Sequence, residues 1–410
     1  MKTEVLGGGR LLGATPQVPE GLDAYLATGG FSTGPSPDRL LQWVEAIRLT
    51  GRGGANFPLA AKLRAVRDRP GAKVVVANGA EGEPGSIKDR HLMRFRPFLV
   101  LDGLCRAAAI VNAGSGYVYV TDPIAAQQLR QALRDWWLPI SVGIVEGPAT
   151  YVAGEESAVV RFLNGGPALP TAKPPRPFER GVADEPTLVS NVETLAHLAL
   201  IAAGRPAAGH MLITVSGGGT KPSLREVAIG STLRSVLGGG LRITGALAGG
   251  MFGGLVGSEV LDLPLDQATF RAAGSGLGSG AIHVFNQLSC PVSVAADALS
   301  FLAAESSRQC GVCVSGTRSL AETLAAIAQG HGSTADIERL TRWSETLVGR
   351  GACGLLDAAA RITASLLRLR PAFPHYCAQC LSAPPSLGAR LTVALPELGT
   401  PIRRTEGALS

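Results

Sequence analysis

The chain is poor in charged and aromatic residues, and it has no long apolar run. Of its 410 residues, 17% are charged, 5% are aromatic and 46% are hydrophobic, a composition that excludes an intrinsically disordered protein. The longest uncharged stretches include residues 243–258, which are too few to cross a bilayer, and residues 272–296, which polar residues and Pro291 interrupt. Residues 1–10 lack the apolar core of a secretory signal. We therefore expect a cytoplasmic protein without direct membrane insertion.

Other missing features exclude further chemistries. No dense run of Lys and Arg accompanies the net charge of +6, so we expect no nucleic-acid binding. The six His residues fall in no motif, so no Ser-His-Asp or Cys-His catalytic pair is indicated. Seven Cys residues in a long chain favour metal or redox chemistry over disulfides. Cys105 and Cys290 stand alone in apolar surroundings and are expected in the core.

The first part of the chain alternates between strand and helix patterns. Residues 74–77, 115–120 and 140–145 are β-branched or apolar runs that predict strands. Residues 123–137 carry apolar residues at helical spacing and predict a helix between two of these strands. This alternation is typical of a parallel sheet covered by helices.

The pattern changes twice farther along the chain. Beyond residue 211, strands predicted at residues 212–215 and 259–263 flank a short helix at residues 231–236, for which Ser231 is the expected N-cap. Apolar residues at helical spacing then predict a small bundle. Its four helices are expected over residues 295–305, 318–328, 337–348 and 355–367.

Three polar segments containing Gly follow strands or begin helices. The loop at residues 51–58 could close its backbone N–H groups on a phosphate, with Lys62 adding a full charge. Residues 78–85 follow a strand, where parallel sheets bind ligands. Glu155 and Glu156 open a helix, where they either complement its dipole or act as acceptors beside a pocket. Taken singly, each segment is also explained by a structural turn.

Taken together, five strings in this order resemble one family. They are Gly-Arg-Gly-Gly-Ala-x-Phe-Pro at residues 51–58, Glu-Gly-Glu-Pro-Gly-x-x-Lys-Asp-Arg at 81–90, Gly-Glu-Glu-Ser-Ala at 154–158, Lys-Pro-Pro at 173–175 and Pro-Thr-x-x-x-Asn-Val-Glu-Thr-Leu at 186–195. The pattern closely resembles the NADH-binding flavoprotein subunit of respiratory complex I and the diaphorase subunits of NAD-linked hydrogenases and formate dehydrogenases. The resemblance covers about residues 45–368.

The resemblance implies an α/β fold in three domains with a tail. These are a Rossmann-like FMN and dinucleotide domain (residues 1–208), a small α+β domain of the β-grasp, or soluble-ligand-binding, type (209–288), a helical bundle with a [4Fe–4S] cluster (289–370) and the tail (371–410). By the same resemblance, NAD(H) or NADP(H) stacks over the flavin near Phe57, Glu83, Glu156 and Lys173, with Glu83 and Glu156 as the catalytic residues. The residues implied for FMN are Gly51, Arg52, Gly53, Lys62, Asn78, Glu81, Tyr151, Gly154, Glu155 and Asn191.

The chain departs from the family where the dinucleotide binds. Two aromatic residues that enclose the adenine in the family are replaced by Ala65 and Arg176, so only Phe57 of that set remains. Arg176 is either an ordinary loop residue or a cation that stacks on adenine or binds a 2′-phosphate. The choice between NADH and NADPH therefore stays open. Ala80 and Ser190 also replace a polar Asp and Asn of the family.

The cluster motif is incomplete. The family opens its bundle with Cys-x-x-Cys-x-x-Cys and adds a later Cys, and Cys310, Cys313 and Cys353 occupy three of these four positions. Ser307 stands at the first. The fourth iron is bound by Ser307, or by Cys377 or Cys380 from the tail, or is left open to solvent.

Two functions remain. The first is an oxidoreductase that moves electrons between NAD(P)H and a one-electron carrier, such as ferredoxin or another iron–sulfur subunit, through FMN and the cluster. The alternative is a non-catalytic scaffold or assembly subunit that has lost the dinucleotide site. Retention of Lys62, Glu83, Glu155 and Glu156 favours the enzyme.

Overall fold

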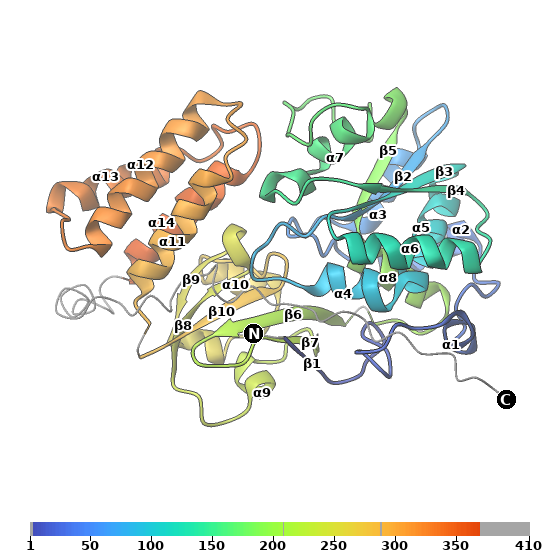
Figure 1. Ribbon diagram of the computed structural model, residues 1–410, viewed down its shortest axis with the longest axis horizontal. Helices are drawn as coiled ribbons and strands as arrows, with labels where there is room; N and C mark the ends of the chain where they lie inside the picture. The colour runs from blue at the N-terminus through green and yellow to red at the C-terminus, as the bar shows by residue number, and fades with distance from the viewer. Residues whose placement is uncertain (1–2, 208, 288, 370–410) are drawn as a thin grey trace.

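The computed structural model describes residues 3–207, 209–287 and 289–369. Within these ranges the chain forms a four-stranded sheet, a six-stranded sheet and a C-terminal group of helices (Figure 1). Cys377 and Cys380, two of the predicted alternatives for the fourth cluster ligand, lie outside the described residues. The chain has a mixed α/β fold with a parallel sheet, as the sequence predicts.

The four-stranded sheet is entirely parallel. Its strands are β2 (Val74–Gly79), β3 (Ser115–Val120), β4 (Ser141–Glu146) and β5 (Thr187–Asn191). They lie in the order β4-β3-β2-β5, so β2 is central and Asn78 pairs with Asn191 across to β5. The predictions of strands at 74–77, 115–120 and 140–145 are confirmed. Because all four strands run in one direction, the polar segments after β2 and β5 meet at one edge of the sheet.

Helices cover the two faces of this sheet unequally. They are α1 (Leu22–Ala27), α2 (Pro37–Ala46), α3 (Leu59–Arg67), α4 (Lys88–Phe95), α5 (Pro97–Val111), α6 (Pro123–Asp135), α7 (Glu156–Leu163) and α8 (Val192–Ala202). Val75 and Ala77 of β2 belong to a large core that includes α3, α5 and α8. On the opposite face, Val159 of α7 packs with Val76. Burial on both faces explains the continuous apolar run of β2.

The six-stranded sheet is mixed. Its strands are β1 (Glu4–Leu6), β6 (His210–Gly217), β7 (Ser223–Ala228), β8 (Ile243–Ala248), β9 (Gly254–Gly257) and β10 (Ala281–Asn286). The order is β1-β7-β6-β10-β8-β9, with β10 parallel to β6 and β1 parallel to β7. The strand β1 therefore pairs outside the region, residues 1–208, to which the sequence assigns it. Two short helices, α9 (Leu233–Leu237) and α10 (Gln267–Ala272), accompany this sheet.

The strand predicted at residues 259–263 is wrong. The chain forms a 3₁₀ turn, η4 (Ser258–Leu261), instead. The N–H groups of Asp262 and Leu263 both turn back to the Glu259 carbonyl, at 3.0 and 3.2 Å. A short apolar run does not distinguish such a turn from a strand.

The predicted cap of the next helix is also wrong, by one residue. The Thr232 hydroxyl oxygen accepts a hydrogen bond from the Ser235 N–H at 3.2 Å and so caps α9. Ser231 instead donates its hydroxyl proton to the Ala228 carbonyl at 2.6 Å. Ser and Thr are both strong N-caps, so their order alone does not decide between them.

Four C-terminal helices follow, as predicted. They are α11 (Pro291–Ala304), α12 (Gly311–Ala328), α13 (Thr334–Thr346) and α14 (Leu355–Leu369). Helix α12 begins earlier than residue 318, because its first turns contain Gly311 and Gly316, which weaken a helical pattern without breaking it. Among the described residues, no helix is long and apolar enough to cross a membrane.

Candidate functional site

The loop at residues 51–58, called the Gly-rich loop below, lies against the end of β5. It precedes α3, which begins at Leu59. A side chain added at Gly53 would place its Cβ 3.2 Å from the Asn191 Cβ. Gly54 has φ +104°, a conformation that favours glycine. The loop thus brings bare backbone to the carboxyl edge of the sheet, which suits a phosphate or a flat ring.

Four of the predicted site residues meet in one cluster of alternating charge, made of Lys62, Glu155, Glu156 and Lys173. The Lys62 ammonium lies 3.2 Å from a Glu156 carboxylate oxygen, and Lys173 lies 3.4 Å from the other oxygen of the same group. Lys173 also forms an ion pair with Glu155. These side chains are 22–30% exposed, so they line an accessible surface. The cluster joins α3, α7 and the loop that contains the Lys-Pro-Pro string at residues 173–175.

The neighbouring charges favour the ionised forms of Glu156 and Lys173. Burial acts to raise the pKa of Glu156, but Lys62 and Lys173 outweigh it and lower that pKa. Burial acts to lower the pKa of Lys173, whereas hydrogen bonds and attraction from Glu155 and Glu156 raise it overall. Glu155 is further fixed as the N-cap of α7, accepting from Ser157 N–H at 2.9 Å.

Asn78 connects the end of β2 to the segment that carries this cluster. Its side-chain amide donates to the Gly154 carbonyl at 2.8 Å and accepts from the Ala80 N–H at 3.2 Å. Gly154 belongs to η1 (Tyr151–Gly154), immediately before α7. Both polar atoms of Asn78 are therefore engaged by the backbone, which makes it an organiser of the loop.

Glu83 faces the second sheet. Its carboxylate accepts a hydrogen bond from the Met251 N–H at 2.9 Å. Burial raises the pKa of Glu83 to about 7, against the opposing effect of backbone donors at Met251 and Gly85. A side chain at Gly250 would collide with this carboxylate at 2.2 Å. The sequence gives no sign of the Gly250–Met251 turn, because only the fold brings η3 (Gly250–Phe252) to Glu83.

Tyr151 links the same region to the helical bundle. Its ring stacks on Phe252 with centroids 5.8 Å apart and meets Phe301 edge-on at 5.4 Å. Its backbone N–H donates to Glu305 at the end of α11, at 2.8 Å. Aromatic packing of this kind adds to the stability from area burial alone. Tyr151 therefore lies between the carboxyl edge of the parallel sheet and the Cys-bearing helices.

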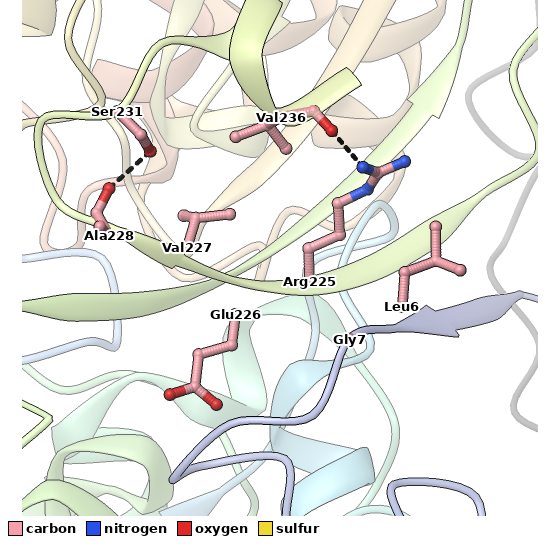
Figure 2. Close-up of a pocket in the computed structure, with 8 residues that line it drawn as sticks. All are labelled: Leu6, Gly7, Arg225, Glu226, Val227, Ala228, Ser231 and Val236. Atoms are coloured by element: carbon pink, nitrogen blue, oxygen red, sulfur yellow. Dashed lines mark hydrogen bonds between the residues drawn. The ribbon is translucent and has the colours of Figure 1, made fainter. Parts of the chain in front are cut away.

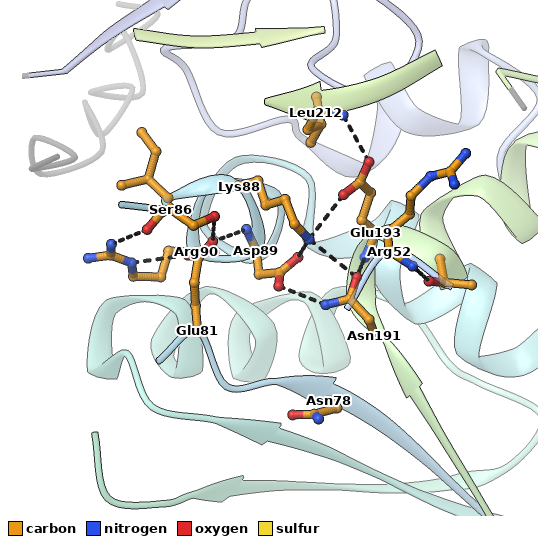
Figure 3. A network of polar contacts seen from close by, with 12 residues as sticks. Arg52, Asn78, Glu81, Ser86, Lys88, Asp89, Arg90, Asn191, Glu193 and Leu212 are labelled. Atoms are coloured by element: carbon orange, nitrogen blue, oxygen red, sulfur yellow. Dashed lines mark hydrogen bonds and ion pairs between the residues drawn. The ribbon is translucent and has the colours of Figure 1, made fainter. Parts of the chain in front are cut away.

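Three other predicted residues, Arg52, Glu81 and Asn191, lie in a network of polar contacts beneath the loop (Figure 3). Glu81 accepts from the N–H groups of Asp89 and Arg90, both at 3.1 Å, at the start of α4. Arg52 donates its N–H to the Thr194 hydroxyl at 2.9 Å. Asn78 lies apart from this network (Figure 3).

The centre of the network is Lys88, a residue to which the sequence motifs assign no role. Its ammonium lies 2.7 Å from Asp89 and 3.0 Å from Glu193. Burial acts to lower the pKa of Lys88, but these carboxylates outweigh it and raise that pKa. Lys88 and Asp89 stand in the second of the five strings, and Glu193 in the fifth, so the motifs contain them without revealing their contacts.

Two residues relevant to adenine binding are accessible. Phe57 is 54% exposed and stands out from the Gly-rich loop. Arg176 is exposed as well, and its backbone N–H donates to Glu179 at 2.8 Å. Ala65 is half-buried on α3. The open choice between a loop role and a ligand role for Arg176 therefore stays a prediction.

The three predicted cluster cysteines come from two helix starts. Cys310 is the N-cap of α12, Cys313 lies in its first turn, and Cys353 precedes α14. Burial raises the pKa of the Cys353 thiol most, and repulsion from Cys313 and Cys310 adds to it. The three sulfurs are therefore within electrostatic reach of one another. Helix N-termini stabilise thiolates, the form that binds iron.

Ser306 contacts a cluster cysteine, which the sequence motif does not predict. Its hydroxyl lies 3.6 Å from the Cys313 sulfur, whereas Ser307 remains a prediction for the first ligand position. Within the described part of the chain, no three His, Cys, Asp or Glu side chains enclose a single metal ion. Three cysteines at two helix starts nonetheless match the donor chemistry of an iron–sulfur cluster, whose irons are held by separate thiolates.

A separate pocket of about 380 Å³ lies beside β1 and β7 (Figure 2), and the residues that line it include none of the predicted site residues. Arg225 extends along it and donates to the Val236 carbonyl. The Glu226 carboxylate is bound by the N–H groups of Leu11 and Leu12, at 3.0 and 3.1 Å. The charged groups of this pocket are thus engaged in holding the N-terminal segment to the sheet.

Comparison with known proteins gives a match for the part of the chain that contains the Gly-rich loop and a second match for the helices that carry the cysteines. Residues 44–200 match the family model described as the Nuo51 FMN-binding domain, and residues 293–375 match the NADH-ubiquinone oxidoreductase-F iron-sulfur binding region. The chain is 32% identical to an F subunit of the NADH-quinone oxidoreductase of Rhizobium meliloti (strain 1021), over 88% of this chain and 94% of that protein. It is 30% identical to the NADP-reducing hydrogenase subunit HndC of Solidesulfovibrio fructosivorans, over 82% of this chain and 76% of the relative.

A solved structure agrees with these relatives. The chain is similar to a chain of an NAD⁺-reducing [NiFe]-hydrogenase crystallised in the air-oxidized state, with a TM-score of 0.77 and 28% identity, covering 93% of this chain and 72% of that one. FMN, a [4Fe–4S] cluster and NADH are the cofactors of this family. The chain belongs to the family of NADH-oxidising flavin and iron–sulfur oxidoreductase subunits that occur in complex I and in hydrogenases.

Proposed function

We propose that this chain moves electrons between NAD(P)H and a one-electron iron–sulfur carrier, such as a ferredoxin or a partner subunit, in the cytoplasm. The observation that carries the proposal is the meeting of Lys62, Glu155, Glu156 and Lys173 beside the Gly-rich loop. A scaffold would have no need for four partly exposed side chains of alternating charge, paired with one another at the edge of a sheet. The names of several relatives also describe parts of NAD- or NADP-linked enzymes.

The residues divide the binding work between them. Bare backbone at Gly51 and Gly53 would receive the flavin and its phosphate, and Lys62 would supply a cation there. Phe57, more than half exposed, would stack on a ring of the dinucleotide. Glu156 and Lys173 would orient its polar groups, since each retains accessible surface.

Glu83 would act at the nicotinamide end of the site. Its carboxyl group accepts a hydrogen bond from the Met251 N–H, and burial raises its pKa to about 7, so it would accept a hydrogen bond from the nicotinamide or carry a proton. Glu156 remains ionised beside two ammonium groups and would act only as an acceptor. When FMN is bound it supplies the exchange between two-electron and one-electron transfer that this chemistry needs.

The cluster would be held by Cys310, Cys313 and Cys353, near Tyr151 and away from the dinucleotide side. Tyr151 packs against Phe252 and Phe301, so these apolar rings would lie between the flavin side of the site and the helices that carry the cysteines. A second copy of the Cys motif in the tail, Cys377 and Cys380, is one of three proposed routes to the fourth ligand, beside Ser307 and an open iron.

The proposal is tested by visible spectroscopy of the full chain purified without oxygen and reconstituted with FMN, iron and sulfide. Addition of NADH or NADPH is expected to bleach the flavin absorbance, and the faster of the two identifies the physiological dinucleotide. A matched Glu83→Gln/Glu156→Gln variant is expected to keep the flavin and react more slowly. A protein that binds FMN but is bleached by neither dinucleotide would favour the scaffold alternative.

A further inference from the structure

Lys88 is a buried lysine that the proposed chemistry does not use. Its side chain is 1% exposed, at the first position of α4. A buried ammonium group is costly unless charged and polar partners replace its water. The partners found here lie on several segments of the chain, so the position of Lys88 constrains more than its own helix.

The contacts of Lys88 converge on Asn191. Besides its two carboxylate partners, the Lys88 ammonium donates to the Asn191 side-chain oxygen at 3.4 Å. The Asn191 amide nitrogen donates to Asp89 at 2.7 Å, and its oxygen also accepts from the Glu193 N–H at 3.0 Å. Asn191 is thereby fixed in one orientation as the N-cap of α8 (Figure 3).

The Gly-rich loop rests on this fixed end of α8. Gly53 packs against the Asn191 side chain, with only 3.2 Å between an added Cβ and the Asn191 Cβ. The first turn of α8 also contacts the loop directly, because the Thr194 hydroxyl accepts a hydrogen bond from the Arg52 N–H at 2.9 Å. Displacement of Asn191 would therefore displace the backbone that receives the flavin.

The same network reaches the second sheet. Glu193, which pairs with Lys88, accepts from the Leu212 N–H of β6 at 2.9 Å. The Arg52 guanidinium donates to the His210 carbonyl of that strand at 3.4 Å. Hydrogen bonds and ion pairs thus connect the Gly-rich loop, α8 and β6 to one buried cation, the ammonium group of Lys88.

We propose that Lys88 is a positioning residue of the flavin site, which fixes Asn191 and the first turn of α8 so that residues 51–54 are held in a flavin-binding conformation. This inference rests on the proposed placement of FMN against the Gly-rich loop. It concerns how that loop is held, and Lys88 itself would touch no substrate or cofactor. Three cations of the network, Arg52, Lys88 and Arg90, balance the carboxylates of Glu81, Asp89 and Glu193.

This balance of buried charges determines which substitution can test the role of Lys88. Lys88→Met alone would leave excess buried negative charge and destabilise the fold. Lys88→Met/Asp89→Asn removes one charge of each sign, keeps an acceptor for the Asn191 amide and removes the tether on the Asn191 oxygen. Thr194→Val is a second, nearly isosteric variant that removes the acceptor of the Arg52 N–H without altering any charge.

A matched control exists on the same helix. Arg94 and Asp122 form another buried ion pair, between α4 and the N-cap of α6. Arg94→Met/Asp122→Asn removes a comparable pair, and Asn still caps α6. Any general loss of stability therefore occurs in both double variants, whereas a loss of flavin positioning occurs in only one.

The experiment titrates FMN into the full chain stripped of flavin, at a temperature well below each variant's melting point, and follows quenching of flavin fluorescence. The Lys88→Met/Asp89→Asn variant is expected to bind FMN at least about tenfold more weakly, equivalent to about 1.4 kcal/mol, and to change the visible circular dichroism of the bound flavin. The Arg94→Met/Asp122→Asn control is expected to keep the wild-type affinity and spectrum.

Equal FMN affinities in the wild type and a folded Lys88→Met/Asp89→Asn variant would overturn the inference. If that variant does not fold, Thr194→Val decides, with weaker flavin binding expected and an unchanged affinity contradicting the proposal. Failure of the wild type to bind FMN would instead contradict the proposed placement of the flavin, so the two outcomes are distinguishable.

Discussion

Reversing the charge at Lys62 should abolish most flavin affinity. In the wild type the Lys62 ammonium lies 3.2 Å from Glu156. Lys62→Glu would set a carboxylate beside Glu156 and in place of the cation proposed to meet the FMN phosphate, which that carboxylate would repel by about 4 kcal/mol at a separation of about 4 Å and an effective dielectric constant of about 20. Both side chains are about 30% exposed, so screening reduces the effect. We expect a net loss of about 2 to 3 kcal/mol in FMN binding, roughly a hundredfold in Kd.

The assay is the titration of flavin-free protein with FMN, with Arg64→Glu as the matched control. Arg64 lies on the same helix and pairs with Glu45, and both side chains are largely exposed. Its reversal removes a surface ion pair that is worth at most about 1 kcal/mol and should leave FMN affinity unchanged. A Lys62→Glu protein with wild-type affinity, or an equal loss in both variants, would refute the assignment of Lys62 to the flavin site.

Three further predictions concern other parts of the site. The pKa of Glu83 is raised from its usual value to about 7 in the folded protein, so the contribution of its protonated carboxyl group to stability is complete below pH 4.5 and is lost as the pH rises through about 7. Glu83→Gln should therefore raise the melting temperature relative to wild type at pH 8 and leave it nearly unchanged at pH 4.5. Equal shifts of the melting temperature at both pH values would contradict the burial of this carboxyl group. Arg176→Ala should raise the KM for the dinucleotide more than it lowers kcat, whereas identical steady-state kinetics would make Arg176 an ordinary loop residue. Iron and sulfide analysis should show a cluster that Ser307→Ala destabilises if serine is the fourth ligand and that Cys377→Ala/Cys380→Ala destabilises if the tail supplies it; a protein without iron after reconstitution would exclude the cluster.

The sequence predicts the framework of the site well because its elements follow from local patterns. The run Val74–Ala77 has to be a doubly buried strand, and the polar segment after it has to lie at the carboxyl edge of the sheet. The helix after Glu155 likewise follows from an acidic N-terminus before apolar residues at helical spacing. These local rules indicate where each segment lies in the fold, and the resemblance to the family implies that Lys62, Asn78 and Glu155 belong to one site.

The remaining features depend on contacts between distant segments. Met251 lies against Glu83 although 168 positions separate them in the chain, and the Leu212 N–H of β6 donates to Glu193 of α8. Glu81 and Asn191 look like ligand residues in the motifs, but the fold commits much of their hydrogen bonding to Lys88, Asp89 and the start of α4. No periodicity or spacing distinguishes a side chain that faces a ligand from one that supports it from beneath.

In the proposed function, this one chain passes electrons from a reduced dinucleotide to its own iron–sulfur cluster. The most direct measurement mixes the anaerobically reconstituted protein with NADH or NADPH, freezes the sample at successive times and records electron paramagnetic resonance. We expect the signal of a reduced cluster to appear in the wild type, with bleaching of the flavin, and to be absent in a Cys353→Ala variant that still binds FMN. Flavin bleaching without any cluster signal in the wild type would contradict the proposed function.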